Sequence, residues 1–313
     1  MAFCGILNHI GATPMVQVSL GGDDTMRIYA KAEYLNPGGS IKDRVALYIL
    51  DQAEKRGELQ KGMTILEATS GNTGIAVAMV GAAKGYDVKI VMPENMSDER
   101  KKMIRALHAE LVLTPAEKSV KGAVDMLNAL RSSESHVYVP GQFENQDNSM
   151  AHYLSTGPEI WDAMGGHVDV FVSGLGSGGT LMGTGRFLKE KNPDVKIVAV
   201  EPKNVSALLG HEPGLHRIEG IGDGFVPSIV DTGLIDDVVE IDDERALGMT
   251  KRLAAQHGLL VGISSGANVC AALDIRRRFG KNTRIATIFP DGAERYFSTE
   301  LFAEKGRPLS VAV

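Results

Sequence analysis

Lys42 is the residue of this sequence best placed for covalent chemistry. It lies in the stretch 36–44, where a Pro-Gly-Gly turn ends an alternating strand pattern at 27–34 and Ser40 is suited to cap a following helix. In the first turn of that helix the exposed N–H groups carry partial positive charge, which disfavours the ammonium and favours the free amine needed for a Schiff base. Taken alone, the residue also fits an ordinary solvated lysine beside Asp43.

A glycine-rich stretch at 174–180 is the strongest phosphate-binding signal in the chain. It follows an apolar run and precedes a predicted helix, so its backbone N–H groups are unobstructed and can surround an anion. The same glycines satisfy Gly-x-Gly-x-x-Gly, and Glu201 ends the next predicted strand, where an acid can bind a ribose. A dinucleotide-binding oxidoreductase and a purely structural turn are therefore alternatives for this stretch.

Two further stretches hold small hydrogen-bonding side chains at predicted helix starts. The stretch 69–74 lacks the lysine of a nucleotide-binding P-loop; its groups suit a carboxylate, and Asn72 could donate to a phenolate-like oxygen. Ser264 offers a neutral hydroxyl, which would leave a facing pyridine nitrogen unprotonated and favour β-elimination over transamination. In isolation, each stretch also fits an ordinary helix cap.

The composition narrows the class of protein. The chain has 313 residues, 43% hydrophobic and 23% charged, which is enough for two domains or one large α/β unit. A net charge of −6 gives no reason to expect nucleic acid or an anionic membrane as a partner. Cys4 and Cys270 are far apart and the histidines are scattered, so we expect no disulfide framework, no metal and a reducing, cytoplasmic location. We also expect neither a signal peptide nor a membrane span.

Strands and helices are predicted to alternate along the chain, and the pattern restarts near Val137. One helix is expected to open at Ile75 and another to be capped by Ser97. The expected strands lie at 15–18, 27–34, 63–68, 88–92, 110–113, 137–139, 168–172, 195–200 and 284–289. This alternation predicts an α/β fold with largely parallel sheets covered on both faces, and a ligand site between two halves.

Matching stretches then point to a known family. In chain order they are 36–44, 67–74, 92–97, 156–161, 176–180 and 262–266. Together they resemble the cysteine synthase (O-acetylserine sulfhydrylase) and cystathionine β-synthase family, within the fold-type II pyridoxal-phosphate enzymes. The resemblance implies two three-layer α/β domains with mostly parallel sheets, similar to the β subunit of tryptophan synthase. The implied domains are a smaller N-terminal one, 36–145 with 1–12, and a larger one, 13–35 with 146–313.

The resemblance also implies a role for each motif residue. Lys42 would form the Schiff base with pyridoxal 5'-phosphate and act as the catalytic base, Asn72 would bond the 3′ oxygen of the cofactor, and Ser264 would face its ring nitrogen. The residues implied to surround the phosphate are Gly176, Ser177, Gly178, Gly179 and Thr180. Those implied to hold the substrate carboxylate are Thr69, Ser70, Gly71, Asn72, Thr73 and Gln142.

The implied activity is β-replacement, in which L-cysteine forms from O-acetyl-L-serine and sulfide through an α-aminoacrylate intermediate. Relatives with the same core use serine with homocysteine, as in cystathionine β-synthase, or release sulfide from cysteine, and these remain alternatives. Many cysteine synthases carry alanine where this chain has Asp223, in the loop 220–225. We hypothesise that Asp223 broadens the reaction toward serine or cysteine as donor; a loop residue that faces water is the other interpretation.

The resemblance also suggests partners, and the motif residues argue against other classes of protein. Family members are usually homodimers, and some bind the C-terminal tail of serine acetyltransferase in the active site. The chain ends without a regulatory domain, so we do not expect a cystathionine β-synthase controlled by adenosine ligands. A nicotinamide oxidoreductase would leave Lys42 and the stretch 69–74 without a role. A non-catalytic homologue would not need Lys42, Asn72 and Ser264 together.

Overall fold

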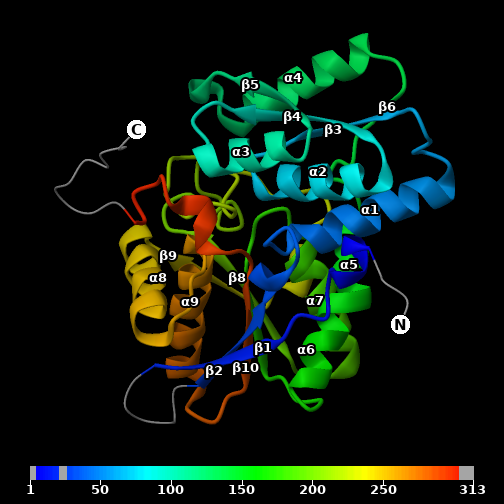
Figure 1. The fold of residues 1–313 in the computed structure, drawn as a ribbon. Coiled ribbons are helices and arrows are strands. Elements are labelled where there is room, and N and C mark those ends of the chain that lie inside the picture. Colours follow the sequence, from blue (N-terminus) through cyan, green and yellow to red (C-terminus); the bar gives the residue numbers. More distant parts are fainter. Residues whose placement is uncertain (1–4, 21–26, 303–313) are drawn as a thin grey trace.

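The computed structural model describes residues 5–20 and 27–302, and its strands form two sheets (Figure 1). The strands of the larger sheet are Met15–Ser19 (β1), Arg27–Ala32 (β2), Val170–Gly174 (β7), Lys196–Pro202 (β8), Asp237–Ile241 (β9) and Ile285–Phe289 (β10). Their order is β1-β2-β10-β7-β8-β9. The pair β1–β2 is antiparallel, and all other neighbours in this sheet are parallel.

The smaller sheet is entirely parallel among the described residues. Its strands are Thr64–Ala68 (β3), Asp87–Pro93 (β4), Glu110–Thr114 (β5) and Val137–Tyr138 (β6). They are ordered β5-β4-β3-β6. The prediction of an α/β fold with mostly parallel sheets is therefore confirmed. All four strands lie between residues 36 and 145, while the domain boundaries stay a prediction.

Helices cover both faces of each sheet, as parallel strands require. The helices are Lys42–Arg56 (α1), Asn72–Lys84 (α2), Asp98–Ala106 (α3), Ser119–Ser133 (α4), Asp147–Ala151 (α5), Gly157–Ala163 (α6), Gly179–Lys191 (α7), Asp243–His257 (α8) and Ile263–Phe279 (α9). In Figure 1, α8 and α9 lie on one side of the larger sheet, and α6 and α7 lie on the other. Around the smaller sheet, α4 lies on the side opposite α1, α2 and α3.

The core follows the two-residue period of the strands. Four of the five residues of β7 are buried. Phe171 packs in a cluster with Leu181 of α7, whereas the next residue, Val172, packs in a different cluster with Ala271 of α9. Because successive side chains point to opposite faces, one apolar strand supplies both layers of core. This packing places the carboxyl end of β7, and therefore the glycine-rich loop, at the edge of the core.

Two predicted helix starts differ from the structure, and a third lies where it was predicted. Helix α2 begins at Asn72 and not at Ile75, because the first turn of a helix tolerates polar residues whose N–H groups need no intrahelical partner. Ser40 is not the cap of α1: Ile41 holds that position, and the Ser40 hydroxyl accepts a 3.3 Å bond from the Lys42 N–H. Ser97 does precede α3, but its side chain makes no capping bond.

Two remaining observations bear on composition. Within residues 5–20 and 27–302, no helix combines the length and apolar character needed to cross a membrane. Cys270 is a buried free thiol in α9, whereas Cys4 lies outside the described residues.

Candidate active site

The Lys42 amine meets the glycine-rich loop. Its Nζ donates a 3.0 Å hydrogen bond to Oγ of Ser177, which lies 135 residues further along the chain. Lys42 is brought there by the turn before α1, because the Ile41 N–H bonds the carbonyl of Pro290, directly after β10, at 2.8 Å. A left-handed Gly39 (φ 77°) closes that turn through a 2.7 Å bond to the Asn36 carbonyl. The structure therefore brings the stretch 36–44, which carries Lys42, into contact with the glycine-rich stretch 174–180.

The surroundings of Lys42 favour its neutral amine. Burial lowers the pKa of Lys42, while the negative charges of Asp223 and Glu67 oppose the decrease. The direction agrees with the expectation from the sequence, but the largest cause is desolvation and not the field of the helix. An amine with a lowered pKa is a better nucleophile toward a carbonyl and a better proton acceptor near neutral pH.

The glycine-rich loop joins β7 to α7 and leaves little space for side chains. Gly178 precedes α7 with φ of 87°, in the left-handed region that glycine adopts without strain. A Cβ on Gly176 would lie 2.5 Å from the Gly220 carbonyl oxygen, so this loop is packed against the start of the loop 220–225. The N–H groups in the first turn of α7 have no partner within the helix, and they form a potential anion site.

Two residues that the sequence analysis missed hold this loop in place. The Asn148 amide donates a 3.0 Å bond to Oγ of Ser177. The Nε2 atom of His152 lies 3.2 Å from Oγ1 of Thr180, and its Nδ1 lies 2.9 Å from Oγ1 of Thr156. Burial lowers the pKa of His152 well below its usual value, so the ring is neutral. No spacing or repeat pattern marks either residue, and only the packing of α5 and the turn after it against α7 identifies them.

The loop between β3 and α2 brings together several of the residues predicted to hold a carboxylate. The Thr73 hydroxyl donates a 2.8 Å bond to Oε1 of Gln142, which is 69 residues away in sequence. The Thr69 hydroxyl accepts a 3.0 Å bond from the Gly71 N–H and shapes the turn. Thr69, Thr73 and Gln142 are buried, whereas Ser70 in the same loop is only partly buried.

Asn72 has a partner that the sequence did not suggest. Its Nδ2 donates a 2.7 Å bond to Oδ2 of Asp291, which lies 219 residues away. The same oxygen accepts a 2.7 Å bond from the Tyr296 hydroxyl. The Oδ1 atom of Asn72 is buried without a hydrogen-bond partner in the described part of the chain. The side chain of Asn72 therefore has a free acceptor, whereas its amide donor is engaged by Asp291.

Ser264 and Asp223 complete the set of predicted residues. Ser264 is buried in the first turn of α9, beside a bond of 3.0 Å from the Gly262 N–H to the Asp291 carbonyl. The Asp223 side chain is exposed to solvent, although protein atoms near its carboxyl group partly desolvate it. Burial raises the pKa of Asp223, and the charges of Lys42 and His216 oppose the increase. Because solvent reaches the side chain, we expect the increase to be limited.

Glu67, near the end of β3, is a second acid whose charge acts on the Lys42 amine, and it is buried. Its Oε2 accepts a 3.3 Å bond from the Gly141 N–H. Burial raises the pKa of Glu67 to about 8, against the opposing charge of Lys42. Its position two residues before the stretch 69–74 was visible in the sequence, but the burial that raises its pKa was not.

These residues fit pyridoxal phosphate. An aldehyde needs an amine with a lowered pKa, which Lys42 supplies, and a phosphate needs the free N–H groups at the start of α7. Asn72 has an unpartnered acceptor, Oδ1, among the described residues, and its donor Nδ2 already bonds Asp291, so its bond to the 3′ oxygen of the cofactor stays a prediction. Gly178 and its left-handed conformation permit the close backbone approach that an anion requires.

Comparisons with known proteins agree with this chemistry. Residues 6–291 match the family described as "Pyridoxal-phosphate dependent enzyme". A cysteine synthase of Staphylococcus aureus is 44% identical over 301 residues, which are 95% of this chain and 96% of the relative. The crystal structure of an O-ureido-L-serine synthase has a TM-score of 0.93 at 41% identity and covers 98% of both chains.

A second solved structure is similar to nearly the whole chain. It is the O-acetylserine dependent cystathionine β-synthase from Helicobacter pylori, with a TM-score of 0.91 and 41% identity over 97% of this chain and 100% of that chain. With an amine of lowered pKa beside a glycine-rich helix start, and with this similarity over nearly its full length, the chain belongs to the pyridoxal-phosphate dependent enzymes.

Proposed function

We propose that this protein forms L-cysteine from O-acetyl-L-serine and sulfide by β-replacement with pyridoxal phosphate. The observation that carries the proposal is the contact of 3.0 Å between Nζ of Lys42 and Oγ of Ser177 in the glycine-rich loop. This contact unites an amine suited to a Schiff base with a site suited to a phosphate. The cysteine synthase of Staphylococcus aureus, similar over 95% of this chain, supports the choice of reaction.

Lys42 has two tasks in this proposal. It binds the cofactor through Nζ, and once a substrate amine has taken its place it accepts the proton from the substrate α-carbon. The lowered pKa of Lys42 leaves a fraction of the amine unprotonated near neutral pH, as a general base requires. The cofactor, when bound, supplies the electron sink that stabilises negative charge at the α-carbon.

The loop 69–74 and Gln142 position the substrate. Hydroxyl, amide and N–H groups at the start of α2 bind the carboxylate, and the bond between Thr73 and Gln142 holds both side chains in one orientation. A bound carboxylate fills this loop, excludes water and directs the α-proton toward Lys42. Ser264 presents a neutral hydroxyl to the ring nitrogen, which suits β-elimination better than transamination.

The remaining expectations are part of the same proposal. The residues 36–145 with 1–12 form the smaller domain, 13–35 with 146–313 form the larger one, and the protein acts as a homodimer in the cytoplasm. Burial of Cys270, a free thiol, fits a reducing compartment. The C-terminal tail of serine acetyltransferase is a further candidate ligand, because a C-terminal carboxylate suits the loop 69–74.

The test begins with the covalent bond. Protein supplied with cofactor and reduced with borohydride should carry the added mass on the peptide that contains Lys42, and Lys42→Ala should lose both this mass and the visible absorption band. A spectral titration with O-acetylserine, and then with sulfide, should give a change that the nucleophile reverses with formation of cysteine. Absence of the added mass on Lys42 would overturn the proposal.

A second candidate reaction rests on Asp223. Its charge interacts with Lys42, and an acid with a raised pKa can assist a less reactive leaving group. Serine or cysteine would then serve as donor, with sulfide, homocysteine or another thiol as nucleophile. The titration is repeated with serine and cysteine in wild type and Asp223→Ala. An unchanged ranking of O-acetylserine, serine and cysteine would refute the role of Asp223.

A further inference from the structure

Arg100 joins the loop 69–74 to the opposite side of the molecule. It belongs to α3, and its side chain is only 4% exposed. A Cβ on Gly71 would lie 2.3 Å from Cδ of Arg100, so the arginine packs directly against the backbone of the loop proposed to hold the substrate carboxylate. Gly71 therefore permits this approach, and any larger residue would displace Arg100.

The guanidinium of Arg100 contacts two segments from elsewhere in the chain. Its Cζ lies 4.9 Å from the ring centroid of Tyr296, in a cation–π arrangement. Its Nη1 forms an ion pair with Glu219, whose side chain is 33% exposed. Glu219 directly precedes the loop 220–225, which carries Asp223. One buried cation thus contacts three segments that are distant in sequence.

The contacts of Arg100 form a closed circuit that begins and ends at two neighbouring residues of the loop 69–74. Tyr296 donates to Oδ2 of Asp291, and the same oxygen accepts the amide of Asn72, each at 2.7 Å. Starting at Asn72, the chain of contacts therefore runs through Asp291, Tyr296 and Arg100, and returns to Gly71. A displacement of Arg100 must move the start of α2 or break one of these contacts.

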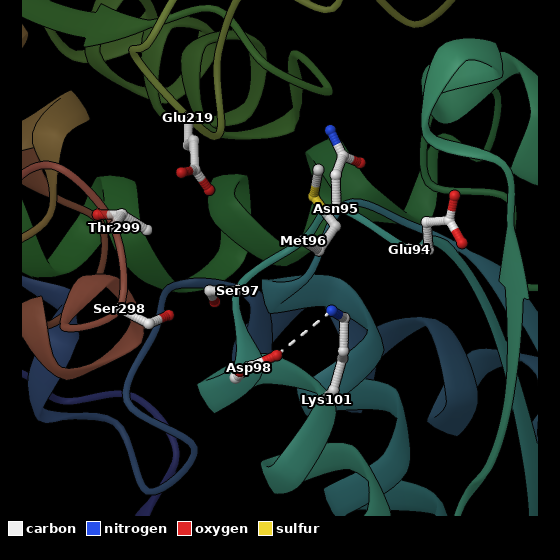
Figure 2. Close-up of a pocket in the computed structure, with 9 residues that line it drawn as sticks. All are labelled: Glu94, Asn95, Met96, Ser97, Asp98, Lys101, Glu219, Ser298 and Thr299. Atoms are coloured by element: carbon white, nitrogen blue, oxygen red, sulfur yellow. Dashed lines mark hydrogen bonds and ion pairs between the residues drawn. The ribbon is translucent and has the colours of Figure 1, made fainter. Parts of the chain in front are cut away.

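An open pocket of about 440 Å³ is lined by Glu219, the ion-pair partner of Arg100 (Figure 2). On one side are residues at the start of α3, and on the other are Glu219, Ser298 and Thr299. Figure 2 shows these groups facing one another across the gap. The two sides are not closely packed at the pocket, so little apolar contact opposes their relative movement. The ion pair of Arg100 and Glu219, and a 2.6 Å bond from the Ser298 hydroxyl to Glu99, connect them.

We propose that Arg100 is a positioning residue. Its ion pair with Glu219 fixes the position of the loop 69–74 relative to the loop 220–225, and this position sets the affinity for the amino-acid substrate. The proposal rests on the proposed function, because it assigns the substrate carboxylate to the loop 69–74. Arg100 acts through the backbone of Gly71 and not on the reacting atoms. Weakening the pair should therefore change substrate binding more than turnover.

The principal test is Glu219→Gln, which removes the charge and keeps the shape. The matched control is Glu212→Gln, because Glu212 lies in the same segment between β8 and β9 and its side chain is exposed. We expect Glu219→Gln to raise KM for O-acetylserine about fivefold with kcat within about twofold, as for loss of a partly exposed ion pair. In wild type, raising salt from about 0.05 to about 0.5 M should also raise KM, and Glu219→Gln should remove this dependence.

A second arm does not depend on activity. Hydrogen exchange of the cofactor-loaded protein, measured without substrate, should be about fivefold faster at the amides of 69–76 in Glu219→Gln than in wild type. Arg100→Lys should act similarly, and the double variant should be no worse than either single variant, because both remove one interaction. Arg105→Lys, an exposed position on the same helix, is the control for Arg100→Lys.

The outcomes separate the two proposals. If wild type carries cofactor on Lys42 and makes cysteine, but Glu219→Gln matches Glu212→Gln in KM, salt dependence and exchange, the role of Arg100 is refuted and the proposed function stands. If wild type does not bind the cofactor through Lys42, the proposed function fails, while hydrogen exchange of the same variants without cofactor still decides whether the ion pair holds the loop.

Discussion

The Nε2 atom of His152 lies 3.2 Å from Oγ1 of Thr180, so a neutral imidazole buried beside α7 contacts the last residue of the glycine-rich loop. The second nitrogen of the ring lies 2.9 Å from Oγ1 of Thr156, and this contact orients the ring. Because burial lowers the pKa of His152 well below its usual value, the imidazole adds no charge to the proposed phosphate site. It holds the Thr180 hydroxyl in place.

Thr180→Val should weaken cofactor binding. The change removes the hydroxyl that contacts His152 and leaves a buried ring nitrogen without this partner, which should raise the dissociation constant for pyridoxal phosphate about five- to tenfold. Equilibrium dialysis of the cofactor-free protein measures the constant. Thr184→Val, one turn further along α7, is the control: its Oγ1 is buried without a partner, so its removal should leave binding unchanged and stability equal or higher.

Glu67→Gln should change how stability depends on pH. Burial raises the pKa of Glu67 to about 8 in the folded state, so the folded protein binds more protons than the unfolded chain between the two pKa values. Stability should therefore fall as pH rises from about 4.5, the usual value, to about 8. The variant lacks this penalty, and at pH 9 it should be more stable than wild type by roughly 1–4 kcal/mol.

Urea unfolding at pH 5, 7 and 9 would measure this effect. Glu212→Gln, at an exposed position, provides the matched control. A gain in stability that is equal at pH 5 and pH 9 would contradict the assignment of this pH dependence to Glu67.

Gly178→Ala should destabilise the glycine-rich loop. The position has φ of 87°, and an added Cβ would lie 2.5 Å from Cγ2 of Val230, so both backbone strain and steric overlap act against it. We expect a loss of about 2–4 kcal/mol in the free energy of unfolding. Gly57→Ala has a similar φ of 74° but open space around the added Cβ, so it should cost only about 1 kcal/mol. Equal losses for the two variants would show that the contact with Val230 is unimportant.

Arg44→Met should be among the most damaging single changes near Lys42. The guanidinium makes two bonds of 2.7 Å to Glu33 and two of 2.7 Å to Glu159, and it is almost fully buried. Its removal takes away four charge-assisted bonds and leaves Lys31, 2.7 Å from Glu159 and 3.9 Å from Glu33, to balance both carboxylates, at a cost of about 3–5 kcal/mol in unfolding free energy. Thermal and urea unfolding would measure the loss.

Arg56→Met, at the other end of α1, is the control. That arginine pairs with Glu58 and Asp147 but its side chain is 42% exposed, so its loss should cost far less stability than the loss of Arg44. A result in which both variants lose the same stability would contradict the importance of burial for the Arg44 network.

Sequence reasoning predicted the local features of the site well. The glycine-rich loop lies between a strand and a helix, and Lys42 occupies the first turn of its helix, as expected. These features depend on residue type and short-range periodicity, which a sequence displays directly. The cap at Ser40 and the helix start at Ile75 were wrong, because helix ends depend on hydrogen bonds that the pattern does not specify.

The sequence by itself determined which chemical groups are available and which local structure carries each of them: an amine at a helix start, unobstructed N–H groups after a strand, and hydroxyls beside a turn. Only the tertiary structure decided which of these groups meet, since Lys42 and Ser177 are 135 residues apart and Asn72 and Asp291 are 219 apart. Such pairs depend on the order of strands in two sheets and on crossover connections, which leave no periodic signal in the chain. Burial, which lowers the pKa of Lys42 and raises that of Glu67, likewise exists only once the layers have packed.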